Sequence, residues 1–306
     1  MKRILDCTAS DFQQMNGQDL KQSIRASEGR VMLSETIASV APLYPSVTNA
    51  ELAAAFGADL LLINVFDVFH PAIQGLDGGA ESESVIQKIK ELTGRPVGLN
   101  LEPVDLQAEQ LEKLDTVSRG RLATEEALAE AKKLGFDFVC LTGNPKTGVT
   151  NEETVVAIQK AREVFGEDGL IIAGKMHGAG VANETGSGII SEAILSSFIE
   201  AGADVILMPA PGTVPGITLE AAEKYVRFVH SKGALAMLTI GTSQEGADES
   251  TIRQIALNSK MAGADIYHIG DTGFYGIAVP ENIMTYSIAI RGRRHTYVRM
   301  AASVKR

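Results

Sequence analysis

The chain has 306 residues, of which 45% are hydrophobic, and its formal net charge is −10. Binders of nucleic acid or of membrane surfaces need a basic face, so this acidic balance argues against both kinds of partner. The length fits one domain, and we expect residues 1–306 to form it, with residues 1–30 as an N-terminal extension.

The two cysteines, Cys7 and Cys140, match neither a disulfide framework nor the spacing of zinc ligands. Such sparse use of cysteine fits a reducing compartment. The first residues contain no apolar run that would serve as a signal peptide or a membrane span. We therefore expect a cytoplasmic protein.

The N-terminal extension contains a predicted helix from Asp19 to Ser27. This helix would close the floor of the fold or contact a neighbouring subunit. An alternative concerns the segment from Arg3 to Cys7, which has the pattern of a short strand. A strand there would shift the numbering of every later strand by one.

Eight short apolar segments follow, separated by segments with helical periodicity. The predicted strands are Val31–Glu35, Asp59–Asp67, Val97–Glu102, Phe138–Leu141, Leu170–Lys175, Val205–Pro209, Leu235–Ile240 and Ile266–Gly270.

The segments between the strands carry helix signals at both ends. Thr48, with Glu51 three residues later, has the capping-box pattern, and similar patterns begin at Thr124, Asn151 and Thr218. Four of the segments end in a repeated Gly-Ala-Asp or Gly-Phe-Asp sequence, whose glycine can take the left-handed conformation that closes a helix. The repeats begin at Gly57, Gly135, Gly202 and Gly263.

Eight strands alternating with helices predict an α/β fold, a single (β/α)8 TIM barrel with a short N-terminal extension and a C-terminal helix. The C-terminal helix is rich in basic residues, although the chain is acidic. We interpret it as a solvated or subunit-contacting helix rather than an anion site, and we expect a homo-oligomer.

The chemistry of such a barrel lies at the C-terminal ends of its strands. Side chains alternate along a strand, so if Val97 and Leu99 face the helices, Asn100 and Glu102 face inward. Buried polar groups cost free energy unless they are satisfied, so a ring of them indicates a binding site. The candidate substrate-binding residues are Asn64, Asn100, Thr142, Asn144, Thr239 and His268, the last of which could instead be a hydrogen-bonded core histidine.

Lys175 follows a run of apolar and small residues. Partial desolvation there would lower the pKa of its amine and permit Schiff-base or general-base chemistry. Alternatively, Lys175 reaches the rim or pairs with Glu102. We expect His177 on the same face, and we predict Glu102 as acid/base, Lys175 as electrophile and His177 as proton shuttle.

The turns after the seventh and eighth predicted strands contain small and hydroxyl-bearing residues. Many barrels bind a phosphate at this place through backbone N–H groups. The predicted phosphate-binding residues are Gly241, Thr242, Ser243, Gly270 and Thr272. Asp271 departs from this pattern, because a carboxylate repels a phosphate unless a cation lies between them.

These features resemble the phosphate-binding TIM-barrel enzymes. The stretch from Ser23 to Glu35 also resembles an uncharacterised bacterial TIM-barrel group labelled phosphonomutase-like or haloacid-dehalogenase-like. The second label implies an Asp-x-Asp nucleophile motif, which Asp6-Cys7-Thr8 does not match. The first implies a metal-binding carboxylate motif, of which the sequence contains no close copy.

The sequence therefore predicts an enzyme that acts on a small anionic, phosphorylated metabolite as an aldol-type lyase, isomerase or epimerase, without a cofactor. One alternative is a hydrolase or lyase assisted by Mg or Mn at Glu35, Asp67 and Glu102. Another is a barrel that binds a metabolite without catalysis.

Overall fold

The computed structural model describes residues 1–76, 84–109, 113–182, 184 and 186–306. Its eight parallel strands close into a barrel in which each strand pairs with its neighbours in sequence and β1 pairs with β8. The strands are β1 (Val31–Ile37), β2 (Leu60–Asn64), β3 (Val97–Leu101), β4 (Phe138–Leu141), β5 (Ile171–Gly174), β6 (Val205–Pro209), β7 (Leu235–Ile240) and β8 (Ile266–Ile269). The predicted TIM barrel is confirmed, and the strands differ from the predicted ones only at their ends.

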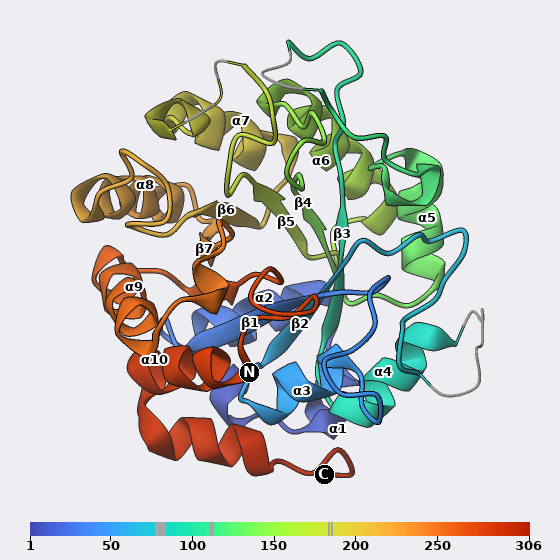
Figure 1. The fold of residues 1–306 in the computed structure, drawn as a ribbon. Helices are drawn as coiled ribbons and strands as arrows, with labels where there is room; N and C mark the ends of the chain where they lie inside the picture. Colours follow the sequence, from blue (N-terminus) through green and yellow to red (C-terminus); the bar gives the residue numbers. More distant parts are fainter. Residues whose placement is uncertain (77–83, 110–112, 183, 185) are drawn as a thin grey trace.

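Helices surround the strands as an outer ring (Figure 1). The ring is formed by α3 (Asn49–Ala55), α4 (Val85–Thr93), α5 (Glu125–Lys133), α6 (Asn151–Phe165), α7 (Glu192–Ala201), α8 (Leu219–Ser231), α9 (Glu249–Ala262) and α10 (Pro280–Ala301). Short 3-10 turns are η1 (Ile4–Asp6), η2 (Arg119–Arg121), η3 (Gly186–Ile189) and η4 (Gln244–Gly246). No helix among the described residues is long and apolar enough to cross a membrane.

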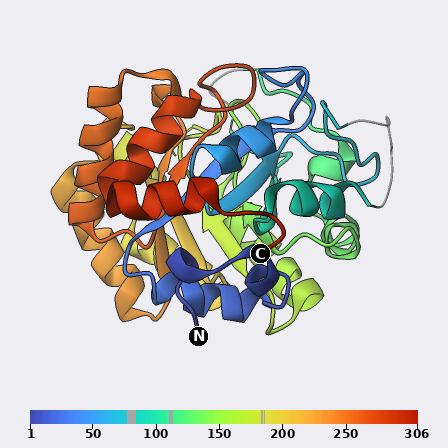
Figure 2. The same ribbon diagram turned by 90° about the horizontal axis from the view of Figure 1, so that it is seen from below.

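The N-terminal segment closes one end of the barrel with α1 (Ala9–Phe12) and α2 (Gly17–Arg25), as Figure 2 shows. Phe12, Leu20 and Ile24 join the apolar cluster of the barrel interior. The predicted helix therefore exists as the floor of the barrel. The alternative strand at Arg3 to Cys7 is wrong, because Ile4–Asp6 forms a 3-10 turn packed against this floor.

The helix starts are capped by side chains, as predicted. Thr48, Thr124 and Thr218 each accept a hydrogen bond from the backbone N–H three residues later, which satisfies one exposed donor of the first turn. For α6 the prediction was one residue late, since Thr150 rather than Asn151 is the cap.

The two faces of the strands pack into different apolar clusters, one between the strands and the helices and one in the barrel interior. Val97, Leu99 and Leu101 pack in the outer cluster between strands and helices, whereas Phe138 and Cys140 belong to the interior cluster. Gly98 leaves room for the Phe138 ring, since a Cβ at position 98 would overlap it. The predicted faces of β3 and β4 are therefore confirmed.

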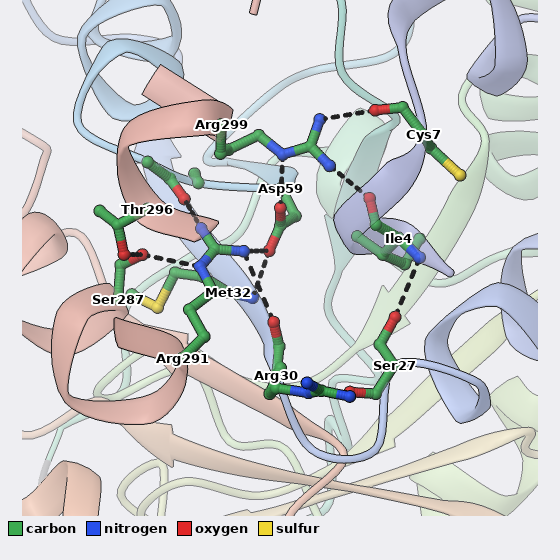
Figure 3. Close-up of polar contacts among 12 residues, drawn as sticks. Ile4, Cys7, Ser27, Arg30, Met32, Asp59, Ser287, Arg291, Thr296 and Arg299 are labelled. Carbon is green, nitrogen blue, oxygen red and sulfur yellow. Dashed lines mark hydrogen bonds and ion pairs between the residues drawn. The ribbon is translucent and has the colours of Figure 1, made fainter. Parts of the chain in front are cut away.

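The C-terminal helix is held to the barrel by a buried carboxylate, Asp59, at the start of β2 (Figure 3). Arg291 and Arg299 of α10 both pair with it, and Arg299 Nε lies 2.7 Å from Asp59 Oδ1. Arg299 also donates to the carbonyls of Ile4 and Cys7. Two of the basic residues of the C-terminal segment thus bind the helix to the barrel and its floor.

Candidate functional site

A cavity of about 210 Å³ opens at the C-terminal ends of the strands. Barrel enzymes carry their chemistry at this end. The cavity is lined by Glu35, Ile37, Asn64, Asn100, Thr142, Gly143, Asn144, Pro145, Met176, His177, Gly241, Glu245, Asp271 and Thr272.

Three asparagines form a hydrogen-bonded network around Asn64, which ends β2. The Oδ1 atom of Asn64 accepts from the side-chain amides of Asn100 at 3.0 Å and Asn144 at 3.1 Å. In return, Asn64 Nδ2 donates to Asn144 Oδ1 at 2.7 Å and to Asp271 Oδ2 at 2.9 Å. The predicted inward amides therefore meet, and they fix the orientation of Asp271, which follows β8.

Three carboxyl groups line the same cavity and are almost fully buried. Burial, followed by the charges of Glu245 and Glu102, raises the pKa of Glu35 to about 8. Burial and then the charge of Glu35 raise the pKa of Asp271 to about 7, against the hydrogen bond from Asn64. Burial also raises the pKa of Glu245. Near neutral pH, Glu35 and Asp271 can therefore take up and release protons.

His268 lies below the cavity, in the barrel interior, with a fully buried side chain. Its Nε2 atom is 3.0 Å from Glu35 Oε2, and its Nδ1 atom has no hydrogen-bond partner among the described residues. Burial lowers the pKa of His268 to about 4, so the ring is neutral near pH 7. The structure matches the alternative role, a hydrogen-bonded core histidine that orients Glu35.

The predicted phosphate cradle is filled by a carboxyl group of the chain itself. A Cβ at position 270 would overlap Glu245 Oε1, so Glu245 packs directly on Gly270. The amide of Gly270 donates to the carbonyl of Ile240 at 2.9 Å, and Thr242 Oγ1 donates to the carbonyl of Thr213. The geometry therefore argues against the phosphate hypothesis, because a phosphate would meet a carboxyl and already-paired donors.

Lys175 has a different orientation from the predicted one. The interior cluster contains Leu170 and Ile172, so alternation along β5 places Lys175 on the opposite face. Its side chain is buried and pairs with Glu184, which also accepts the backbone N–H of Asn151 at 3.1 Å. Burial lowers the pKa of Lys175, and the Glu184 pair opposes that shift. Lys175 therefore does not line the cavity beside His177 as predicted, because its amine is held by Glu184.

Glu102, the predicted acid/base, does not line the cavity, and both of its carboxylate oxygens have partners within the protein. One oxygen pairs with Arg121 of η2, and Oε2 accepts the backbone N–H of Asn144 at 3.0 Å. Glu102 thus holds the loop after β4 against the segment that follows β3.

His177 lies in the cavity lining, as predicted. Its Nδ1 atom accepts the backbone N–H of Ala179 at 3.1 Å, which leaves the ring hydrogen on Nε2. Burial and then the charge of Lys175 lower the pKa of His177 to about 4. His177 is therefore a neutral hydrogen-bond donor near pH 7.

Of the remaining predicted site residues, some line the cavity and others do not. Thr142, Gly241 and Thr272 line the cavity, whereas Thr239 donates its hydroxyl to the carbonyl of Met208 at 3.0 Å. Ser243, with φ of 76°, precedes η4 outside the lining.

The alternative metal set is not assembled. Glu35 lines the cavity, but Glu102 pairs with Arg121 and Asp67 accepts the backbone N–H of Phe69 in a surface turn. Across the described parts of the chain, no group of three or more His, Cys, Asp or Glu side chains is placed to hold a metal ion.

Three buried polar atoms in the lining lack a hydrogen-bond partner within the described protein: Asn100 Oδ1, Thr142 Oγ1 and Glu245 Oε2. Such atoms cost free energy unless a ligand or water satisfies them. A larger hollow of about 310 Å³ lies at the floor, next to Phe12 and Arg95. The charged groups there, Arg95 among them, are already paired with carbonyls or with each other. We therefore take the cavity at the strand ends as the candidate site.

Sequence reasoning gave no catalytic or substrate-binding part to three carboxyls that line the cavity, Glu35, Glu245 and Asp271. Glu35 appeared only in the alternative metal set, and Asp271 only as a departure from a phosphate motif. The sequence did contain a signal for two of them. Glu35 lies near the end of β1 and Asp271 follows β8, and these strands are neighbours in a closed barrel, so the two side chains are expected to lie close together. Glu245 gave no such signal, since it lies in a turn.

The chain belongs to the family described as "Domain of unknown function (DUF7916)", whose model matches residues 5–306. No curated protein matches it. Among solved structures, 2,3-dimethylmalate lyase, a PEP mutase/isocitrate lyase superfamily member, is 14% identical with a TM-score of 0.50, covering 86% of this chain and 80% of that one. Thiamine phosphate pyrophosphorylase from Pyrococcus furiosus is 12% identical with a TM-score of 0.47, covering 86% and 96%. Such low identity shows similarity of fold alone.

Proposed function

We propose that this family member is an enzyme that moves protons on a small polar metabolite by general acid–base catalysis, as a lyase, isomerase or epimerase. The observation that carries the proposal is that Glu35 and Asp271, with pKa values of about 8 and 7, line one cavity. A catalytic acid or base works best when its pKa lies near the working pH. Perturbed carboxyls of this kind are typical of functional sites.

Mutual repulsion divides the two roles between the carboxyls. Since the charge of Glu35 raises the pKa of Asp271, the pair resists full ionisation and titrates as a coupled unit. Asp271, held by Asn64, is the proposed base that removes a proton from the substrate. Glu35, supported by His268, is the proposed acid that returns one.

The other predicted catalytic residues take supporting parts in this proposal. His177 offers its Nε2 hydrogen to a substrate oxygen. Lys175 and Glu102 act as positioning residues, since each is paired with a loop residue outside the lining.

The size of the cavity limits the substrate. A volume of about 210 Å³ is below the range of drug-sized ligand pockets, which begins at roughly 300 Å³. The substrate is therefore a small metabolite.

A divalent cation such as Mg or Mn is the cofactor of the second candidate, a metal-assisted lyase or hydrolase. The carboxyl and amide oxygens of Glu35, Asp271 and Asn100 have the donor chemistry that these ions prefer. The placement does not fit, since no metal-binding group of three such acidic or histidine side chains is assembled in the described residues.

The test is hydrogen–deuterium exchange. Pools of small oxo and hydroxy compounds are incubated with the protein in D2O, and deuterium incorporation at carbon is followed by proton NMR. We expect incorporation with one compound class, and a loss of about 100-fold or more in Asp271→Asn and Glu35→Gln, the range for removing a general acid or base. The exposed Glu163→Gln is the matched control.

Lys175→Met adds a further arm, in which we expect the exchange rate to fall less than in Asp271→Asn. Borohydride trapping of a carbonyl substrate on Lys175 would restore the Schiff-base hypothesis. If a compound binds but none incorporates deuterium, the result would favour a non-catalytic metabolite-binding barrel. Exchange that requires added Mg or Mn would favour the metal-assisted reaction.

A further inference from the structure

The asparagine network uses four of its six side-chain amide hydrogens internally. Asn100 and Asn144 direct their amide hydrogens to Asn64 Oδ1, and Asn64 directs its own to Asn144 and Asp271. An amide nitrogen has two hydrogens and no acceptor capacity, so Asn64 has no amide hydrogen left for a ligand, whereas Asn100 and Asn144 keep one each.

The lining also contains buried polar atoms that have no hydrogen-bond partner among the described residues, and most of them are acceptors. Asn100 Oδ1 and Glu245 Oε2 are acceptors whose residues are 2% and 1% exposed, and both residues line the cavity. Thr142 Oγ1, in a residue 1% exposed, can accept or donate. A ligand that donates hydrogen bonds would satisfy all three.

The titratable groups of the lining, apart from the neutral His177, are all carboxyls. Glu35, Glu245 and Asp271 contribute three carboxyls, while no lysine or arginine belongs to the described lining. Lys175 and Arg121, which lie outside the lining, are each paired with a carboxylate. An anion entering the cavity would oppose the ionisation of these carboxyls, whereas a cation would favour their ionised forms and lower their pKa values.

We propose that the cavity recognises a small molecule bearing an ammonium group, held by Glu245, Asn100 and the acidic pair, so that the substrate class is a small amino compound. This inference rests on the proposed function in that it assigns the substrate class of the same site. An ammonium has three donors and no acceptor, which complements the free oxygens in the lining. Hydrogen bonds to charged groups are also the stronger ones.

Three probes of similar size and different charge test the inference: ethanolamine, ethylene glycol and glycolate, each at about 10 mM with a chelator present. Binding is measured by calorimetry and by the shift of the thermal unfolding midpoint. We expect ethanolamine to bind at least about 10-fold more tightly than glycolate, from one charge-assisted hydrogen bond. Ethylene glycol should fall between them.

Glu245→Gln should reduce the preference for ethanolamine over glycolate about 10-fold, since it removes one charged acceptor. Thr142→Val keeps the size of a side chain whose hydroxyl has no partner, so it is the second variant if Glu245→Gln fails to fold, and we expect weaker ethanolamine binding. Glu163→Gln, on the exposed face of α6, should leave all three affinities unchanged.

The inference is overturned if glycolate or inorganic phosphate binds more tightly than ethanolamine, or if MgCl2 alone stabilises the protein and then recruits glycolate. Its failure is separable from that of the proposed function. Ethanolamine binding without deuterium exchange on any amino compound would leave the ligand class standing and remove the catalytic proposal. Deuterium exchange on an oxo acid that carries no amine would leave the catalytic proposal standing and remove the assignment of amino compounds as substrates.

Discussion

Single residues set the protonation behaviour of this barrel. Glu35 and Asp271 are buried carboxyls whose raised pKa values come first from burial and then from neighbouring carboxyls. A water-exposed carboxyl would ionise near pH 4, so the folded state holds these protons well above that pH. The same property that would support proton transfer therefore affects stability.

Stability should fall as the pH rises through this range. Because the folded pKa of Asp271 is raised to about 7, the folded state binds a proton that the unfolded state has lost, and the free energy of unfolding decreases with pH between about 4 and 7. The slope from one carboxyl is at most about 1.4 kcal/mol per pH unit. Asp271→Asn should remove it.

Urea unfolding followed by far-UV circular dichroism from about pH 5 to 8 measures this effect. Asp271→Asn should gain stability relative to the native chain as the pH rises toward 7, with no further gain above it. Parallel profiles for the two proteins would show that Asp271 titrates normally in the folded state.

Individual elements are held together by contacts between distant parts of the chain. Asp59, the residue before β2, meets α10, whose Arg291 and Arg299 approach it from the two sides of the kink at Gly292 (Figure 3). Asp59 Oδ2 also accepts the backbone N–H of Met32 at 2.8 Å. Since all three charged side chains are almost fully buried, each depends on the others for compensation.

Asp59→Asn should therefore destabilise the protein by about 3 to 5 kcal/mol, because it leaves two arginines buried without a counter-charge. The control is Asp6→Asn, whose pair with Arg3 is exposed and should contribute no more than about 1 kcal/mol. Urea unfolding of both variants provides the comparison. Equal, small losses would mean that water or carbonyl groups compensate the arginines.

The whole molecule is a closed sheet, and closure joins the beginning and the end of the chain. The ladder between β1 and β8 completes the barrel, and α10 then packs on α9 and α3 (Figure 1). Opening any strand pair exposes both the interior cluster and the outer layer, which favours loss of structure in one step.

We expect residues 1–306 to unfold in a single cooperative transition. The chain has no tryptophan and six tyrosines, so tyrosine circular dichroism reports tertiary packing. Tyr267 of β8 and Tyr286 of α10 pack edge to face with centroids 5.9 Å apart, both buried. Their near-UV signal should disappear together with the far-UV helix signal. A near-UV transition that precedes the far-UV one would indicate a separately unfolding C-terminal part.

The sequence by itself determined the barrel, its strands, most helix caps and the faces of β3 and β4. These features depend on the two-residue and helical periodicities and on capping residues within a few positions, all of which are local. Even the asparagines Asn64, Asn100 and Asn144 could be placed together, because parallel strands end at the same rim.

Only the tertiary structure decided the chemistry of the rim. The rim brings together residues from separate loops and strands. Glu245 packs on Gly270, Lys175 pairs with Glu184, and Glu35 is buried beside Asp271. A carboxyl's pKa and a lysine's partner depend on distances and desolvation in three dimensions, which strand periodicity does not encode. Lys175 was misplaced because it follows the last residue of β5, Gly174, and its amine is held by Glu184 rather than by the cavity.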